Sequence, residues 1–197
     1  MNYDNDNSAV TRVRPCYTCC HPNGKGTGAT ARFELHPAHD MVEGSLFVTL
    51  APQKTVGSNV DGNRVLPTFD WEKRITVRLT INEVAQMLEV FRGYMETICD
   101  GKGLFHKTVK ASTVIALEHR LEPSPGYLFS VSRKPVDGER QRICVLLSMT
   151  ESIVLSEALA ASMVYMAFGV PSVMARAPKP AQKDGVAANP GRLKEVA

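Results

Sequence analysis

The sequence predicts an α+β protein in which a unit of strands followed by a helix occurs twice. Runs of alternating or β-branched residues give way to helical periodicity at two points of the chain, and each change follows three strand-like runs. The order strands, helix, strands, helix is typical of antiparallel meanders that helices cover. The two halves share this order of elements but little residue identity.

The first half predicts three strands and then a helix, at residues 31–35, 44–51, 73–80 and 80–98. In the helix, apolar residues recur at helical spacing, and Thr80 with Glu83 makes a capping box. The strand before it, "KRITVRLT", alternates Arg74, Thr76 and Arg78 with aliphatic residues. We therefore expect the arginines to face solvent.

The second half predicts the same order, with strands at residues 112–122, 126–134 and 140–148 and a helix from residue 149 to 169. Thr150 is the expected N-cap of this helix, and "EPSPG" and "KPVDGE" are hairpin turns. The helix is apolar nearly all round, which indicates a buried or subunit-contact helix. We expect its subunit contact to use Leu155, Leu159, Met163 and Met166.

We expect one domain at residues 15–172, with halves at about 26–98 and 104–170, between disordered segments at 1–14 and 173–197. The hydrophobic fraction of 44% and the charged fraction of 22% are those of a soluble globular protein. No secretory signal pattern is seen, and the five cysteines are an odd number. These features predict reduced thiols in a bacterial cytosol or nucleoid, with an organelle as the alternative.

Two segments of the chain, "GSLFVTLAPQ" and "FDWEKRITVRLTINEVAQML", resemble the Whirly family of single-stranded-DNA-binding proteins. In the second half, "LFHKT", "LEHRLEPSPGYLFSVSRK" and "ESIVLSEALAASMVYMAFG" fit that family in the same order. The resemblance covers residues 26–169. The kinetoplastid guide-RNA-binding proteins and the positive-cofactor-four coactivators are relatives of this fold.

The resemblance implies two four-stranded antiparallel sheets that pack crosswise, a homotetramer, and sequence-tolerant binding of single-stranded DNA. It also implies roles in DNA maintenance, recombination or transcription. The family motif Lys-Gly-Lys-Ala-Ala-Leu occurs here only as "GKGTGATARF", and the preceding "CYTCCH" is foreign to it. An RNA-binding or annealing protein of the same fold therefore stays as an alternative.

Single-strand binding needs cations along a path and planar groups on which bases stack. The segment "DGKGLFHKTVK" at residues 100–110 combines both, and basic residues and aromatics elsewhere extend it. A place in the core is the alternative for Phe105, Tyr127 and Phe129, and Trp71 is expected to anchor the core. The candidate nucleic-acid-binding residues are Lys25, Lys54, Arg74, Arg78, Lys102, Phe105, His106, Lys107, Lys110, Tyr127, Phe129 and Arg133.

A structural zinc ion is a further hypothesis, because Cys16 and Cys19 are followed by His36 and His39 in a two-by-two pattern that suits tetrahedral zinc. Otherwise no cofactor is expected, and a zinc-stabilised interaction scaffold is the alternative function from another class. The glycine-rich "NGKGTG" lacks the Walker Lys-Ser/Thr pair, so it offers at most a weak anion nest beside Lys25. No HExxH, GxSxG or paired-carboxylate motif is found, so we do not expect an enzyme.

Overall fold

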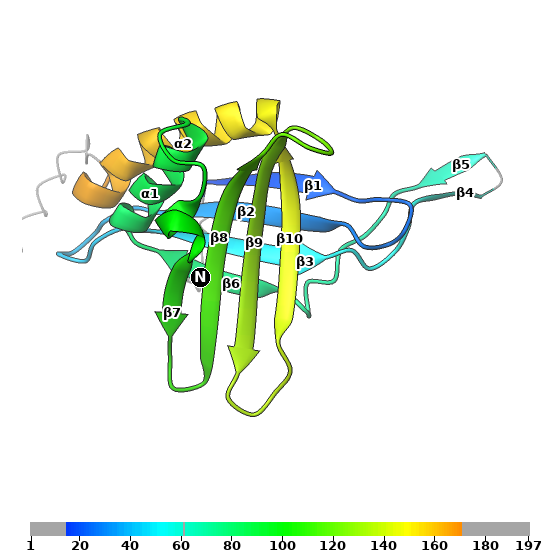
Figure 1. Ribbon diagram of the computed structural model, residues 1–197, viewed down its shortest axis with the longest axis horizontal. Helices are drawn as coiled ribbons and strands as arrows, with labels where there is room; N and C mark the ends of the chain where they lie inside the picture. The colour runs from blue at the N-terminus through cyan, green and yellow to red at the C-terminus, as the bar shows by residue number, and fades with distance from the viewer. Residues whose placement is uncertain (1–14, 61, 171–197) are drawn as a thin grey trace, which may run out of the picture.

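Two four-stranded antiparallel sheets and two long helices build the protein, as the computed structural model shows for residues 15–60 and 62–170 (Figure 1). The α+β fold class with duplicated strands and helices is thus confirmed. In Figure 1 the strands of one sheet cross behind those of the other at a steep angle. The segments predicted to be disordered, 1–14 and 173–197, lie outside the described residues.

The first sheet has the order β1-β2-β3-β6 and is followed by α1. The second has the order β10-β9-β8-β7 and is followed by α2. The elements of the first half are β1 (Cys16–His21), β2 (Ala29–His36), β3 (Ser45–Pro52), β6 (Ile75–Leu79) and α1 (Ile81–Phe91). Those of the second half are β7 (Leu104–Lys107), β8 (Ala111–Arg120), β9 (Gly126–Pro135), β10 (Gln141–Ser148) and α2 (Met149–Phe168).

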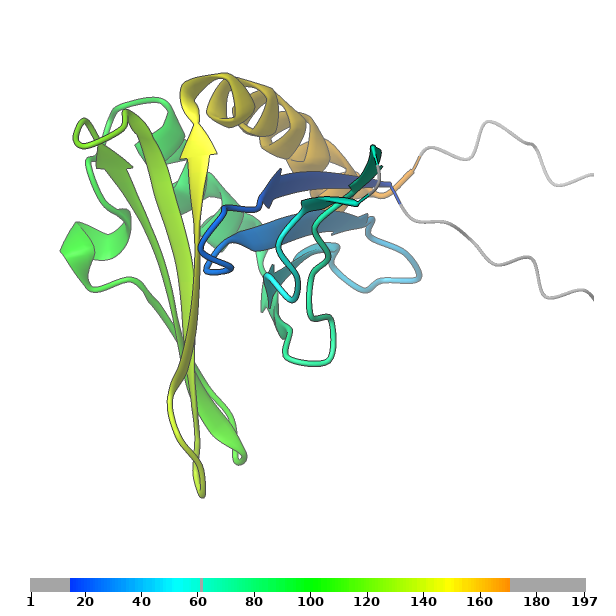
Figure 2. The ribbon, with the colours of Figure 1, turned by 90° about the vertical axis from the view of Figure 1, so that its right-hand side faces the viewer.

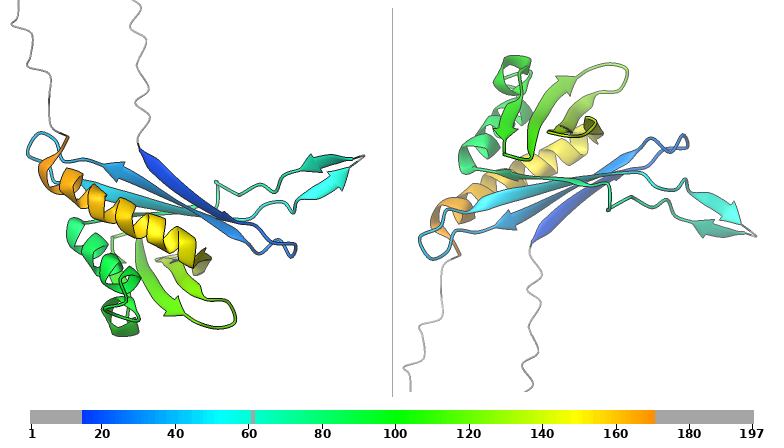
Figure 3. Two further views of the ribbon diagram at one scale, coloured as in Figure 1. Left: turned by 90° about the horizontal axis from the view of Figure 1, so that it is seen from above. Right: turned by 90° about the horizontal axis from the view of Figure 1, so that it is seen from below.

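Shorter elements connect these parts of the chain. Strands β4 (Ser58–Val60) and β5 (Asn63–Val65) pair into a hairpin that projects away from both sheets (Figures 1 and 3). A 3-10 turn, η1 (Ile98–Gly101), leads into β7. The first sheet begins with β1 at Cys16, which lies before the predicted start of the first half at residue 26.

The core lies between the sheets and under the helices. Alternate residues of β6, Ile75, Val77 and Leu79, are buried, while Arg78 on the other face is exposed, as predicted. Phe33 from the first sheet and Phe129 from the second meet with ring centroids 5.9 Å apart. Burial of such side chains from both sheets is the main driving force for their packing.

The helix ends differ in part from those predicted. The Thr80–Glu83 capping box of α1 is confirmed, but the helix ends at Phe91 and not at residue 98. Gly93 adopts a left-handed conformation just beyond it, which turns the chain out of the helix. The N-cap of α2 is Ser148 and not Thr150, because Ser148 is the residue that stands three before a glutamate, Glu151, and can form the reciprocal box.

Helices α1 and α2 pack side by side against the sheets (Figures 2 and 3). On α2, Leu155, Leu159 and Met166 are buried in the core of the same chain. By length and composition alone, α2 is apolar enough to cross a membrane. This is weak evidence for a membrane span, since a core helix of a soluble protein meets the same criteria.

Candidate nucleic-acid interface

The second sheet has one face in the core and one face toward solvent. In Figure 1 the strands β8, β9 and β10 face the viewer, and no described helix crosses them. Alternation along the strands and their registers define this outer face. Its residues are Phe105, Lys107, Ser112, Val114, Ala116, Glu118, Arg120, Leu128, Ser130, Ser132, Lys134, Arg142, Cys144 and Leu146.

Phe105 and Lys107 lie on β7, the edge strand of this face. Leu104 points into the core and fixes the alternation, so the phenyl ring of Phe105 is 62% exposed. An exposed ring beside a lysine suits the stacking of an unpaired base. This settles the alternative for Phe105, which lies on the surface and not in the core.

A hollow of about 270 Å³ opens beside β7, at the end of the sheet that carries the β7–β8 turn. Lys107 lines it from β7, Ser112 from β8 and Lys134 from β9, and the other lining residues are Thr108, Ala111, Pro135 and Val136. The two lysines are suited to contact a phosphate there, whereas the Thr108 hydroxyl donates to the Ala111 carbonyl within the turn. Lys110 is exposed on the adjoining turn, where its carbonyl accepts a hydrogen bond from the backbone N–H of Val136.

Lys134 and Arg142 are outer-face cations that the sequence analysis missed. Their register places Lys134 opposite Ser112, and Arg142 opposite Ser132. The guanidinium of Arg142 donates to the Ser130 hydroxyl at 3.4 Å. The alternation of "YLFSVSRK" already separates Lys134 from the buried residues, so the signal was present once the buried face was known.

Tyr127 and Phe129 are core residues, so the prediction that bases stack on them is wrong. They are 5% and 0% exposed, and the Tyr127 hydroxyl donates to the carbonyl of Phe91 at 3.2 Å. Burial raises the pKa of Tyr127. The β9 residues on the opposite face, Ser130 and Ser132 among them, are the ones that reach the outer face.

Arg133 joins the two sheets and does not lie on the outer face. Its guanidinium donates to the Thr76 carbonyl at 2.5 Å and to the Thr113 hydroxyl at 3.3 Å. The side chain of Gln141 reaches the Lys73 carbonyl in the same way. These contacts occupy the carbonyls of Thr76 on β6 and of Lys73 before it, so Arg133 is a structural residue.

His106 also points inward, and its Nε2 lies 2.5 Å from the Glu83 carboxylate of α1. Burial alone would raise the pKa of Glu83, but hydrogen bonds from Thr80 and His106 outweigh burial and lower this pKa below its ordinary value. The imidazole is therefore engaged with α1 and is not presented as a stacking group.

The remaining candidates fall into separate places. Arg78 is exposed on β6 and Arg74 is exposed just before it, where the Arg74 guanidinium donates to the Trp71 carbonyl at 2.7 Å. Lys102 is exposed just after η1. Trp71 is 41% exposed, so its predicted role as a core anchor is wrong. It precedes the start of β6, where Asp70 instead holds the turn by accepting from two backbone N–H groups.

Lys25 and Lys54 are exposed on segments that Gln53 links. The Gln53 side chain accepts from the N–H groups of Asn23 and Gly28 and donates to the carbonyls of Asn23 and Thr55. A side chain on Gly28 would clash with this amide. The turn N–H groups are thus engaged within the protein, and the predicted anion nest reduces to the side chain of Lys25.

The predicted zinc site is not formed. Cys16 and Cys19 lie on strand β1, where residues three apart point to opposite faces, so Cys16 is exposed and Cys19 is 2% exposed. His36 bonds to Glu34 at 2.9 Å, and His39 lies on an exposed turn. In the described part of the chain no three metal-ligating side chains gather. A metal knuckle needs a turn between its cysteines, and the pairing of β1 with β2 removes it.

The exposed side of α2 carries large apolar residues near both ends and the exposed Glu157 between them. Ile153, Val154, Val164 and Phe168 are 65%, 45%, 56% and 85% exposed. Three of the four residues predicted for the subunit contact, Leu155, Leu159 and Met166, are instead buried in the same chain. The exposed apolar residues stand one or two positions along the chain from these buried residues, on the other side of the helix.

No protein-family model and no curated protein matches the chain. Among solved structures, the chain is similar to the crystal structure of WHY1 from Arabidopsis thaliana, with a TM-score of 0.62 and 19% identity over 80% of this chain and 87% of that one. It is also similar to WHY3 from the same plant, with a TM-score of 0.57 and 19% identity over 77% and 90% of the two chains. The chain has the Whirly fold. At this identity the likeness shows the Whirly fold alone, which confirms the fold that the sequence resemblance implied.

Proposed function

We propose that this protein binds single-stranded nucleic acid without strong sequence preference, with DNA preferred, and has no enzymatic activity. The observation that supports this most directly is the outer face of the second sheet. There, an exposed phenyl ring, Phe105 on β7, shares one surface with the cations Lys107 on β7, Lys134 on β9 and Arg142 on β10. The Whirly fold agrees with the proposal.

The proposed mechanism combines two kinds of contact, ionic attraction of phosphates and stacking of a base. The lysines and Arg142 attract backbone phosphates and release counterions, and a base stacks on Phe105. Small side chains in the middle of the face, Ala116 and Ser132 among them, leave the backbone of the sheet accessible to a flat ligand. Contacts of this kind do not read base edges, so the binding is tolerant of sequence.

The proposal includes an oligomer, a homotetramer, in which α2 makes the subunit contact. The exposed apolar residues of α2 share one side of a helix of 20 residues, and a second copy of the chain would remove them from water. The roles in DNA maintenance, recombination or transcription, and the cytoplasmic or nucleoid location, also belong to this proposal.

Binding of labelled oligonucleotides tests the function. Fluorescence anisotropy would compare oligo(dT), oligo(rU) of the same length and a DNA duplex, at several salt concentrations. We expect the tightest binding to oligo(dT), weakened by salt, and little binding to duplex. Tighter binding to oligo(rU) would favour the RNA-binding alternative. Absence of binding to either single strand at low salt would reject the proposal.

A further inference from the structure

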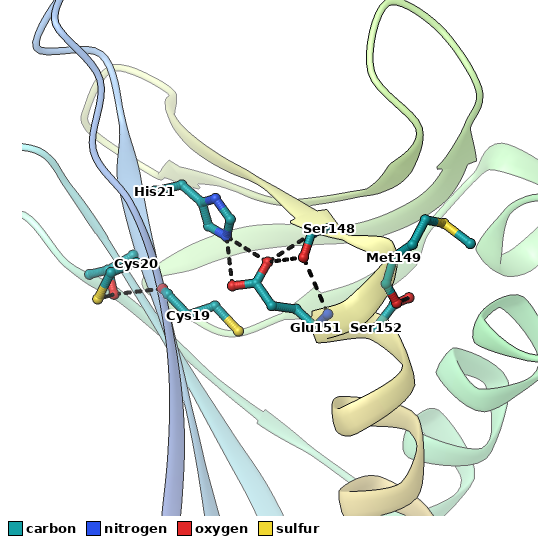
Figure 4. A network of polar contacts seen from close by, with 8 residues as sticks. Cys19, Cys20, His21, Ser148, Met149, Glu151 and Ser152 are labelled. Carbon is teal, nitrogen blue, oxygen red and sulfur yellow. Dashed lines mark hydrogen bonds and ion pairs between the residues drawn. The ribbon is translucent and has the colours of Figure 1, made fainter.

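The two helices of the protein begin with the same arrangement of side chains. Each has a capping box, and the glutamate of each box also contacts a histidine. In α1, Glu83 Oε1 lies 2.5 Å from His106 Nε2. In α2, both carboxylate oxygens of Glu151 lie 3.0 Å from His21 Nε2 (Figure 4). We refer to His21–Glu151 and His106–Glu83 as the two His–Glu pairs.

The two His–Glu pairs are exchanged between the halves of the chain. Helix α1 follows the first sheet, but its glutamate contacts β7, the first strand of the second sheet. Helix α2 follows the second sheet, but its glutamate contacts β1, the first strand of the first sheet. Both β1 and β7 are edge strands with a neighbouring strand on one side only. Each pair therefore adds a second point of attachment to a strand that one ladder holds.

The same spacing follows each histidine. A lysine stands four residues on, Lys25 after His21 and Lys110 after His106, and both lysines are exposed in the turn that leads to the next strand. The β7–β8 turn is closed by a hydrogen bond from the Thr108 N–H to the Ala111 carbonyl at 2.9 Å.

The β1–β2 turn is ordered by its own side chains. The Asn23 carboxamide oxygen accepts from the N–H groups of Lys25 and Thr27, at 3.0 and 3.1 Å. Gln53, which is 8% exposed, holds the base of this turn. The two turns thus occupy equivalent places in the duplicated fold, and each presents one lysine from an ordered backbone.

We propose that the β1–β2 turn is a second nucleic-acid contact equivalent to the β7–β8 turn, and that His21 and His106 are the positioning residues for Lys25 and Lys110. This inference rests on the proposed function. A strand end that is tied to a helix presents its lysine in a fixed place, so less conformational entropy is lost when a phosphate binds.

The histidines act through the lysines and do not contact the nucleic acid. The side chains of His21 and His106 are 33% and 27% exposed, and in each the Nε2 atom is directed at a glutamate. This geometry replaces the earlier expectation that His106 binds nucleic acid directly.

Double-mutant cycles test the positioning role. For each turn, oligo(dT) binding is measured as a function of salt for His→Ala, Lys→Ala and the double variant: His106→Ala with Lys110→Ala, and His21→Ala with Lys25→Ala. Loss of one phosphate contact should reduce the slope of log K against log salt by about 0.7 for a single strand. We expect each histidine variant to reduce the slope, and each double variant to lose no more than the lysine variant alone.

Two results would overturn the positioning role. Additive losses of slope in the double variants would mean that the histidines contact the nucleic acid themselves. An unchanged slope with a lowered melting temperature would mean that they only stabilise the fold. His106→Gln, whose amide can still donate to Glu83, should restore most of the slope, and failure of this rescue would also count against the inference.

Further measurements separate this inference from the proposed function. If Lys110→Ala reduces the slope but Lys25→Ala does not, the second contact is wrong and the proposed function stands. If the wild-type protein binds no oligonucleotide, the function fails, and hydrogen exchange still tests the positioning. In that case His106→Ala should speed exchange of the Val136 N–H, which bonds to the Lys110 carbonyl. Unchanged exchange would reject positioning as well.

Discussion

Replacing Phe105 with alanine should weaken single-strand binding and leave the fold nearly intact. The side chain is 62% exposed, so about 38% of its surface is buried in the folded chain. Full burial of a phenyl side chain contributes about 1.5–3 kcal/mol, so the substitution should cost roughly 0.6–1.1 kcal/mol of folding free energy. That is an upper estimate, because the unfolded chain already buries some apolar surface.

The expected loss of binding free energy is larger. Stacking of a base on an aromatic side chain contributes about 1–3 kcal/mol. Phe105→Ala should therefore raise the Kd for oligo(dT) by roughly 5- to 150-fold. Fluorescence anisotropy at one fixed salt concentration measures the Kd, and thermal unfolding of the same samples measures stability.

Val109→Ala is the matched control for Phe105→Ala. Val109 is 96% exposed on the β7–β8 turn, so its substitution removes an apolar side chain from the same region without removing a ring. We expect its Kd and melting temperature to stay at the wild-type values. The reasoning is refuted if Phe105→Ala changes the Kd less than twofold, or if Val109→Ala weakens binding as much.

Lys107→Ala and Lys134→Ala should each reduce the salt slope of oligo(dT) binding by about 0.7. Arg64→Ala, on the projecting β4–β5 hairpin, should leave this slope unchanged. Equal slopes in all three variants would contradict the proposed interface. Ile153→Glu and Phe168→Glu should dissociate the oligomer in light scattering while the exposed Val136→Glu does not, and an intact oligomer would contradict the α2 contact. Despite the opposing effect of burial, hydrogen bonds from capping and histidine groups lower the pKa of Glu83 and Glu151 from 4.5. The stability that these carboxylates contribute is therefore fully present above pH 4.5 and is lost as pH falls through their lower folded-state pKa values. The melting temperature of Glu83→Gln/Glu151→Gln should thus fall less steeply below pH 4.5 than that of the wild type, and parallel curves would contradict this. Burial, with the nearby Glu151 charge, raises the pKa of the Cys19 thiol to about 12. Iodoacetamide should therefore modify the four exposed cysteines and spare Cys19. Labelling of Cys19 in the folded protein would contradict its burial.

Most strands and both helices were predictable because their sequences alternate or recur with a clear period. Strands β2, β3, β6, β8, β9 and β10 all coincide with predicted runs. Strands β1 and β7, the first strand of each sheet, were not predicted. β7 has only four residues, two of them His106 and Lys107, and β1 has three thiols and a histidine among its six. Such strands form because a neighbour provides a ladder, which is a tertiary effect.

The buried face of β9 was the main ambiguity for the binding site. "YLFSVSRK" places aromatic residues on one face and serines on the other, and alternation alone does not tell which face meets water. The crossing of the sheets decides it, since Phe129 meets Phe33 of the first sheet. Once that contact is known, Lys134 moves to the solvent face and Arg133 to the face between the sheets.

The His–Glu pairs had a sequence signal that could have been found. Both glutamates are the fourth residue of a capping box, and both histidines have a lysine at the same spacing after them. What the sequence does not show is the exchange, because each helix contacts the strand of the other half. Only the crosswise packing brings Glu83 to β7 and Glu151 to β1.

Charge pairing is a reason to propose the second sheet, and not the first, as the binding face. On the outer face of the first sheet, Arg32 lies 3.2 Å from Glu34, which also bonds to His36 at 2.9 Å. The ring of His36 covers Phe47 at a centroid distance of 4.3 Å. In the second sheet Glu118 pairs with Arg120, away from the β7 edge.

Within the described residues no salt bridge or ring contact engages Phe105, Lys107 or Lys134. The difference is already visible in the sequence "RFELH", where an arginine, a glutamate and a histidine alternate along one face of a strand. Such a face neutralises its own cation, whereas "LFHKT" has no acidic residue beside its lysine. Two sheets of one architecture therefore differ in how far carboxylates pair with the cations on their outer faces.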